Sequence, residues 1–190
     1  MRSGLTTLRV HHFLPSSHAN GPGVRAVLWV QGCTLGCSGC FNPSTHSISG
    51  GKEIEVTALS NSFISLKSSI EGITISGGEP LQQIAALTFL CSHIRSKTKL
   101  SIIIFTGFEW HELERIPHLT DLKKMVDVII AGRFVREKRL ARGLLGSSNK
   151  TIQLLSPRYH ESDFYEIPSA EILINPGGEI VSTGIDPLEY

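Results

Sequence analysis

The sequence has almost no net charge and no long apolar run. Its 18 Lys and Arg residues oppose 17 Asp and Glu residues, which leaves a formal charge of +1 at pH 7. So small an excess gives no global reason to expect a nucleic acid or an anionic membrane as partner. The most apolar stretches, such as residues 100–105, are far too short to cross a bilayer, and the first residues lack the apolar segment of a signal peptide. We therefore expect a soluble, cytoplasmic protein.

Cysteine is scarce, with four residues among 190. Three of them, Cys33, Cys37 and Cys40, lie within eight residues. This distribution fits metal ligation in a reducing compartment better than a disulfide framework. The fourth, Cys91, falls on the apolar face of an expected helix, so we expect it in the core.

A chain of this length and composition predicts one globular domain, residues 1–190. Apolar residues at helical spacing predict a helix that starts near a cap at Thr57 and a second helix after Pro80. A shorter helical segment begins at Glu109 and is interrupted at Pro117. Residues 133–145 are expected to form a helix or a long loop. Strands are expected at residues 8–13, 25–31, 72–76, 100–105, 126–130 and 151–155, and a hairpin at 170–175 and 179–182.

Strands that alternate with helices and are apolar throughout predict an α/β fold, with a parallel sheet covered by helices. Ligands of such sheets bind beyond the carboxyl ends of the strands. The segments that follow the strands are the cysteine loop and residues 76–80, 106–108 and 132–134. We expect these segments to lie on one rim.

The cysteine loop has the pattern C-x3-C-x2-C, which supplies three ligands. A structural zinc site needs four, and His46 is the nearest candidate for the fourth. A 4Fe-4S cluster held by three cysteines leaves one iron open to an outside ligand, which makes it a reaction centre. The open position implies a bound substrate or cofactor.

This spacing, followed by the aromatic Phe41, resembles the signature of the radical S-adenosylmethionine (SAM) enzymes. Membership implies an incomplete β/α barrel of parallel strands and a 4Fe-4S cluster on Cys33, Cys37 and Cys40, whose open iron is chelated by the amino and carboxylate groups of SAM. Reductive cleavage of SAM would then yield a 5′-deoxyadenosyl radical. The turn after the second core strand resembles the GGEP motif of these enzymes, in which two glycines allow close approach and a carboxylate accepts from the SAM ammonium group. The SAM contacts implied on this basis are Phe41 (against the adenine), Gly77, Gly78, Glu79 and Pro80.

Four further motifs make the resemblance more specific. Over about residues 18–155 the chain resembles the activating proteins of glycyl radical enzymes, above all the activators of anaerobic ribonucleotide reductase. The motifs are GPG-x-R at 21–25, CFNP at 40–43, FTGF at 105–108 and GSSN at 146–149. The resemblance implies a large glycyl radical enzyme as protein substrate and a flavodoxin or ferredoxin-type electron donor. It adds Asn42, Thr106 and Asn149 as SAM contacts, although Asn149 fits a helix cap equally well.

Two features depart from this resemblance. Ala131 stands where the activators have Asp, and Asp127 is the nearest remaining carboxylate. The C-terminal extension, residues 157–190, is largely absent from the small activators. It is expected to cap a sheet edge or to bind a different substrate protein. The basic residues between 133 and 142 fit either a docking face for an acidic electron donor or a solvated surface.

Two alternatives remain open. One is a radical SAM enzyme that modifies another peptide or a small molecule. The other is a non-catalytic zinc or iron-sulfur binding module.

Overall fold

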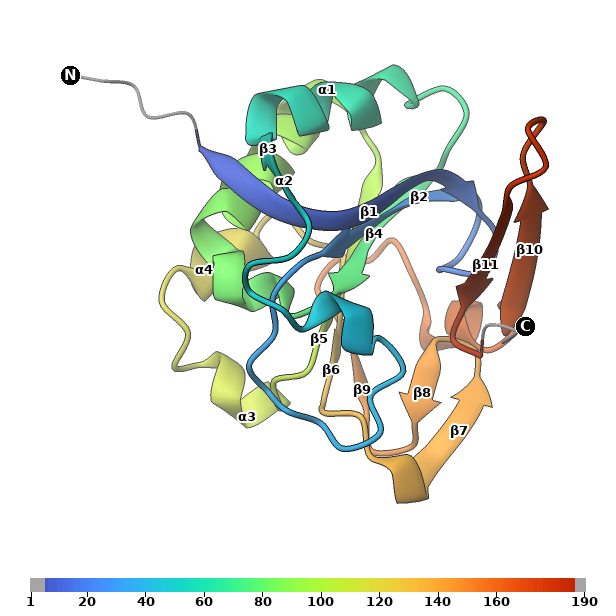
Figure 1. Ribbon diagram of the computed structural model, residues 1–190. Helices are drawn as coiled ribbons and strands as arrows, with labels where there is room; N and C mark the ends of the chain where they lie inside the picture. The colour runs from blue at the N-terminus through green and yellow to red at the C-terminus, as the bar shows by residue number, and fades with distance from the viewer. Residues whose placement is uncertain (1–5, 187–190) are drawn as a thin grey trace.

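The computed structural model describes residues 6–186, so residues 1–5 and 187–190 of the expected single domain lie outside the described residues. A seven-stranded sheet runs through the molecule in the order β3-β1-β2-β4-β5-β6-β9 (Figure 1). Its four central strands are parallel, as neighbouring pairs show. They are β2 (Arg25–Val30), β4 (Gly72–Gly77), β5 (Ser101–Thr106) and β6 (Val128–Ala131).

The α/β class is confirmed, but the expectation that all strands are parallel is wrong at the edges of the sheet. Strand β1 (Thr7–Ser17) is antiparallel to both β2 and β3 (Lys52–Glu55), and β9 (Thr151–Leu154) is antiparallel to β6. The connection from β1 to β2 is a short loop, which reverses the chain without a crossover helix. The sheet is therefore mixed, with a parallel centre.

Most elements expected from the sequence are present. The helices are α1 (Val56–Ser65), α2 (Ile84–Lys97), α3 (Trp110–Leu113) and α4 (Leu119–Lys123), with the predicted break at Pro117. Glu55, not Thr57, is the N-cap of α1. Cys91 is fully buried on α2, as predicted. None of the described helices combines the length and apolarity needed to cross a membrane.

Residues 133–145 form neither a long helix nor a simple loop. They contain the short helical turn η3 (Arg136–Lys138) and the hairpin of β7 (Arg139–Arg142) and β8 (Leu145–Ser147). Strand β3 was also not predicted. The C-terminal hairpin is confirmed as β10 (Ala170–Ile174) and β11 (Ile180–Gly184). The other helical turns are η1 (Pro43–Thr45), η2 (Pro80–Gln83) and η4 (Glu161–Phe164).

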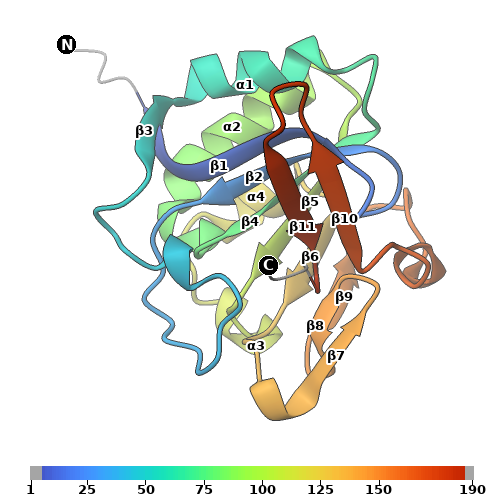
Figure 2. The ribbon, with the colours of Figure 1, turned by 45° about the vertical axis from the view of Figure 1, so that its right-hand side comes forward.

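The two faces of the sheet are covered differently. Helices α1, α2 and α4 lie on one face, and alternate residues of the strands, such as Ile102 and Ile129, pack with them in the larger core cluster. On the other face, Ile103 and Ile130 pack against Phe164 in a smaller cluster. Figure 2 shows the β10–β11 hairpin in front of this second face. The second face thus has a thinner cover than the first.

Candidate functional site

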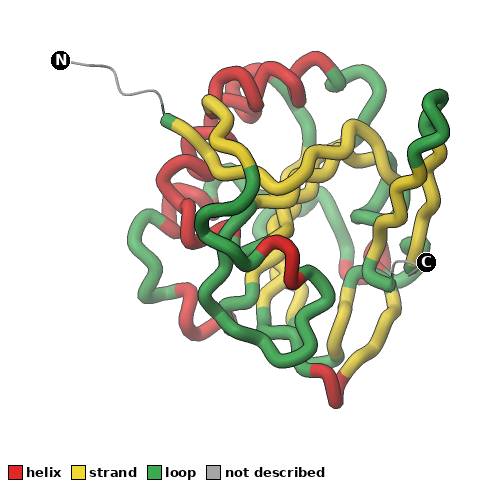
Figure 3. Tube along the Cα trace, in the orientation of Figure 1, coloured by secondary structure: helices red, strands yellow, loops and turns green. Residues whose placement is uncertain are grey.

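The loops that follow β2 and β4 are joined by backbone hydrogen bonds. Figure 3 shows the segment from β2 to β3, which carries the three cysteines, as a long loop interrupted by η1. The amide of Gly78 donates to the Val30 carbonyl at 2.8 Å, and the Glu79 amide donates to the Gly32 carbonyl at 2.9 Å. A Cβ on Gly78 would lie 2.3 Å from the Gly32 oxygen, so only glycine permits this approach. The contact places the GGEP turn against the cysteine loop.

A cavity of about 80 Å³ lies between these loops, at the carboxyl ends of the parallel strands. Most of the residues expected from the sequence line it, as the rim prediction requires. They are Cys33, Cys37, Cys40, Phe41, Asn42, Gly77, Gly78, Glu79 and Thr106. Pro80 and Asn149 are not among its lining residues; Pro80 is buried at the start of η2, and Asn149 lies in the turn before β9.

Glu79 is fully buried and is bonded to the protein itself. Its Oε1 accepts from the Leu81 amide at 2.9 Å and from the Thr106 hydroxyl at 2.8 Å, and its Oε2 accepts from the Gly107 amide at 2.7 Å. Burial raises the pKa of the Glu79 carboxyl, and these hydrogen bonds oppose the rise. Among the described residues Oε2 accepts a single hydrogen bond, so it retains acceptor capacity toward the cavity.

Lys150 lines the same cavity and was missed from the sequence. Its ammonium group donates to the Gly132 carbonyl at 2.7 Å. Burial lowers the pKa of Lys150, while the nearby Cys37 and Glu79 act in the opposite direction. The one sequence signal for this residue is its position directly after the GSSN motif. Lys150 and Glu79 give the cavity one cation and one anion.

Asn149 has a buried oxygen with no hydrogen-bond partner among the described residues. Its amide group donates to the Arg133 carbonyl at 2.9 Å, which leaves Oδ1 free. A buried acceptor without a donor costs about 1–3 kcal/mol, so a bound ligand that donates there would recover that free energy. Asn149 precedes a strand and caps no helix, so the helix-cap interpretation is wrong.

The three thiols are the soft donor set that an iron-sulfur cluster requires. They are free cysteines of intermediate exposure, and burial raises the pKa of Cys33 and of Cys40. Within residues 6–186, no group of three or more His, Cys, Asp or Glu side chains could hold one metal ion, although His46 lines the cavity. The cysteines of an iron-sulfur cluster bind different irons, so they need not converge on one point. The soft donor set, the unpartnered Asn149 oxygen and the close approach at Gly78 therefore fit a 4Fe-4S cluster with a bound ligand.

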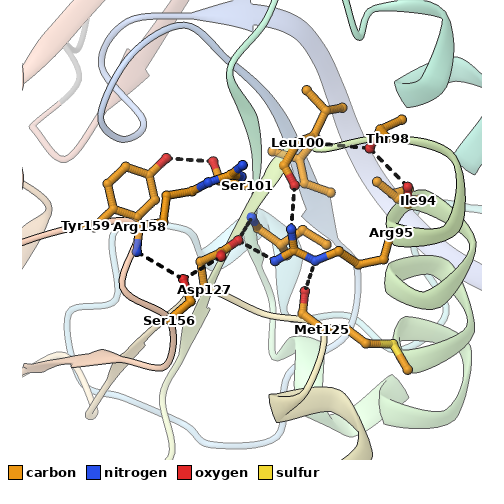
Figure 4. Close-up of polar contacts among 12 residues, drawn as sticks. Ile94, Arg95, Thr98, Leu100, Ser101, Met125, Asp127, Ser156, Arg158 and Tyr159 are labelled. Carbon is orange, nitrogen blue, oxygen red and sulfur yellow. Dashed lines mark hydrogen bonds and ion pairs between the residues drawn. The ribbon is translucent and has the colours of Figure 1, made fainter.

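Asp127 does not replace the carboxylate missing at position 131. It lies at the amino end of β6, where its carboxylate accepts from Arg95 Nη2 at 2.5 Å, from the Ile102 amide at 2.8 Å and from Ser156 Oγ at 2.6 Å (Figure 4). Ala131 is 1% exposed and belongs to the helix-side core. Position 131 is a packing position in this chain.

The chain is similar to several known proteins. Residues 19–153 match the family described as "4Fe-4S single cluster domain". The anaerobic ribonucleoside-triphosphate reductase-activating protein of Enterobacteria phage T4 is 31% identical over 142 residues, which are 73% of this chain and 88% of the relative. The protein of the same name from Escherichia coli K12 is 29% identical over 78% of this chain and 99% of its own length. A pyruvate formate-lyase-activating enzyme from Clostridium pasteurianum is 33% identical over 60% of this chain and half of its own length.

The three-cysteine loop lies at the carboxyl edge of the parallel strands, and the relatives identify the chain as an iron-sulfur protein of the radical SAM class. The chain belongs to the 4Fe-4S single cluster domain family. It is a radical SAM enzyme of the activase type, and its cofactors are a 4Fe-4S cluster and S-adenosylmethionine.

Proposed function

We propose that the chain generates a glycyl radical on a partner enzyme, in the manner of an activator of anaerobic ribonucleotide reductase. The observation that carries the proposal is the gathering of three thiols, the GGEP turn and one opposite-charge pair around one cavity. The relatives from phage T4 and E. coli are named for activation of anaerobic ribonucleoside-triphosphate reductase. When bound and reduced by one electron, the cofactors supply a 5′-deoxyadenosyl radical that removes a hydrogen atom from the substrate.

The residues of the chain have separate roles in this proposal. Cys33, Cys37 and Cys40 hold the cluster. Glu79 would accept a hydrogen bond from the amino group of SAM and Lys150 would pair with its carboxylate, because these two side chains are the acidic and the basic group of the cavity wall.

The remaining wall residues position and shield the cofactor. Gly77 and Gly78 would let the backbone approach SAM, and Asn42 and Thr106 would supply neutral hydrogen bonds. Asn149, which does not line the cavity, would contribute its unpaired buried oxygen. Phe41 packs edge-on against Phe134 with ring centroids 5.4 Å apart, and is 42% exposed, which leaves ring surface for the adenine.

A small electron donor of the flavodoxin or ferredoxin type would dock beside the cysteine loop. The Arg136 side chain lies against this loop at Gly39, where an added Cβ would come within 3.1 Å of Arg136 Cδ. Arg133 and Arg139 are paired with Glu112 and Asp186, whereas no ion pair of Arg136 is recorded among the described residues. An acidic donor surface would complement this cation close to the cluster.

We also propose a division of the chain into a core and a C-terminal extension. Residues 18–155 form the radical SAM domain, an incomplete β/α barrel whose parallel strands are β2, β4, β5 and β6. Residues 157–190 form an extension of the same single domain.

Anoxic reconstitution tests the function. We expect bound iron and sulfide, a SAM-perturbed electron paramagnetic resonance (EPR) signal, and reductive formation of 5′-deoxyadenosine. Incubation with the anaerobic ribonucleotide reductase of the same genome should then give the EPR doublet of a glycyl radical. A stoichiometric, colourless zinc protein would refute the enzyme. SAM cleavage without a glycyl radical would favour a radical SAM enzyme acting on another peptide or a small molecule.

A further inference from the structure

The wall of the cysteine cavity carries one positive charge that the chain does not pair. Among the described residues that line this cavity, Lys150 is the only lysine or arginine, and the lining also contains Glu79 and His46. Within residues 6–186 Lys150 forms no ion pair, and its ammonium group donates to a neutral acceptor, the Gly132 carbonyl, at 2.7 Å. The charge of Lys150 is therefore available to a group inside the cavity.

The chain holds this ammonium group at a fixed place. The Gly132 amide donates to the carbonyls of Thr106 at 3.2 Å and of Phe108 at 2.9 Å, which ties the turn after β6 to the turn after β5. Gly132 has a φ of 124°, and a Cβ there would lie 3.3 Å from Lys150 Cα. Glycine at this position thus lets Lys150 pack closely against the turn whose carbonyl it binds.

The charge of Lys150 acts on the thiols of the cysteine loop. Burial raises the pKa of the Cys40 thiol, and Lys150 lowers it. Burial lowers the pKa of Lys150, and Cys37 is the strongest influence in the opposite direction. Arg133 also acts on Cys37, but its guanidinium group is paired with Glu112 at 2.6 Å, so its charge is largely balanced.

An unpaired cation beside the thiols affects the electron affinity of a cluster bound there. A 4Fe-4S cluster brings the negative charge of three thiolates to this wall, and its reduction adds one more negative charge. A nearby cation stabilises the reduced state more than the oxidised state, so it raises the reduction potential. Glu79 acts in the opposite sense, but its carboxylate already accepts hydrogen bonds from the chain.

We propose that Lys150 raises the reduction potential of the cluster, so that a flavodoxin or ferredoxin-type donor can reduce the cluster before SAM binds. In this step one electron passes to the cluster, the donor is oxidised, and no bond forms or breaks. This inference rests on the proposed function, which assigns the cluster to the three cysteines. It gives Lys150 a role that is separate from pairing with the SAM carboxylate.

An EPR-monitored redox titration of the reconstituted protein tests this role. SAM is left out, because its carboxylate would pair with the ammonium group. Lys150→Met removes the charge, whereas Lys150→Arg retains it. The matched control is Lys97→Met, which makes the same change in net charge at an exposed residue that ends α2 and does not line the cavity.

We expect the ratio of reduced to oxidised cluster at a fixed potential to be at least about tenfold lower in Lys150→Met than in wild type. For a one-electron couple this corresponds to a midpoint about 59 mV lower. The ratio should change less than threefold in Lys150→Arg and less than twofold in Lys97→Met. An unchanged ratio in Lys150→Met, or an equal fall in Lys150→Arg or Lys97→Met, would overturn the inference.

Iron and sulfide content is measured for every variant. If Lys150→Met assembles no cluster, Lys150→Gln replaces it, because the amide retains a donor for the Gly132 carbonyl. Loss of the cluster in both variants would overturn the inference, since the role of Lys150 would then be structural. Formation of 5′-deoxyadenosine by wild type is measured in parallel. Its failure in a protein with a reducible cluster would overturn the proposed function, whereas the titration decides the inference.

Discussion

The two ends of the parallel sheet are built for different purposes. At the carboxyl ends lie glycine-rich turns, three thiols and a buried oxygen that has no hydrogen-bond partner within residues 6–186. At the amino ends lie two buried charged side chains, Arg25 and Asp127, whose polar atoms are bonded within the protein. Polar groups at the carboxyl end can still form hydrogen bonds with a ligand. Those at the amino end are already bonded within the protein and hold strands together.

Arg25 illustrates the amino end. It is 0% exposed and donates to Thr74 Oγ1 at 2.8 Å, Ser101 Oγ at 2.9 Å and the Ile73 carbonyl at 2.6 Å. It also donates to Tyr159 Oη at 3.0 Å, which ties the C-terminal segment to β2, β4 and β5. Burial lowers the pKa of this guanidinium, while Tyr159, Asp127 and Glu71 act in the opposite direction. We infer that function should be sensitive to changes at one end and stability to changes at the other.

The largest effect is expected from the cysteines. Cys33→Ala, Cys37→Ala and Cys40→Ala should each abolish reductive SAM cleavage, because the cluster loses one of three ligands. The measurements are iron and sulfide content and 5′-deoxyadenosine formation. Cys91→Ala is the control, since Cys91 is buried in the core with a pKa raised to about 12, and should retain the cluster. Loss of the cluster in that control would refute the ligand assignment.

Arg25→Met should produce the largest loss of stability. It leaves several buried acceptors unpaired, so the free energy of unfolding should fall by about 3 kcal/mol or more. Urea denaturation of the apoprotein measures the change. Arg9→Met is the control, because Arg9 forms a surface ion pair with Glu53 that contributes about 1 kcal/mol or less. A folded Arg25 variant with strongly reduced SAM affinity would break the distinction between the two ends.

Lys150→Met should weaken SAM binding by about tenfold, equivalent to about 1.4 kcal/mol, because the carboxylate loses its cation. Calorimetric titration of the reconstituted protein measures this affinity, and iron content should stay unchanged. Lys138→Met, which alters the exposed turn η3, is the control. Unchanged affinity in the Lys150 variant would remove this residue from the SAM site.

The sequence predicted the carboxyl end better than the amino end. The sequence predicted that the cysteines, the GGEP turn and Thr106 lie on one rim, because each motif is read locally and the parallel strands bring the motifs to one edge. Lys150 was missed because its one local signal, its position after the GSSN motif, does not show that the lysine reaches the cavity when β9 pairs with β6. The network around Asp127 joins α2, β5 and the C-terminal segment, so no single stretch of sequence contains its signal.

The errors in the fold have a similar cause. Apolar strands with intervening helices predicted the parallel centre, but the direction of β1 and β9 depends on connections whose path is not encoded in hydrophobic periodicity. The pairing of β7 with β8 was not predicted. The chain between residues 133 and 145 contains five basic residues, is largely exposed and lacks the apolar alternation that indicates strands.

The smallest effect is expected from Ser156→Ala, at the amino end. The Ser156 hydroxyl donates to Asp127 Oδ1 at 2.6 Å, while Arg95 and the Ile102 amide hold the other carboxylate oxygen (Figure 4). Because those bonds remain, the free energy of unfolding should fall by only about 1 kcal/mol, and SAM affinity should not change. Urea denaturation measures the free energy of unfolding and SAM titration measures the affinity. Ser162→Ala, at an exposed position, is the control. A change in SAM affinity would mean that the C-terminal segment transmits the state of the amino end to the rim, and the two ends would then act as one unit.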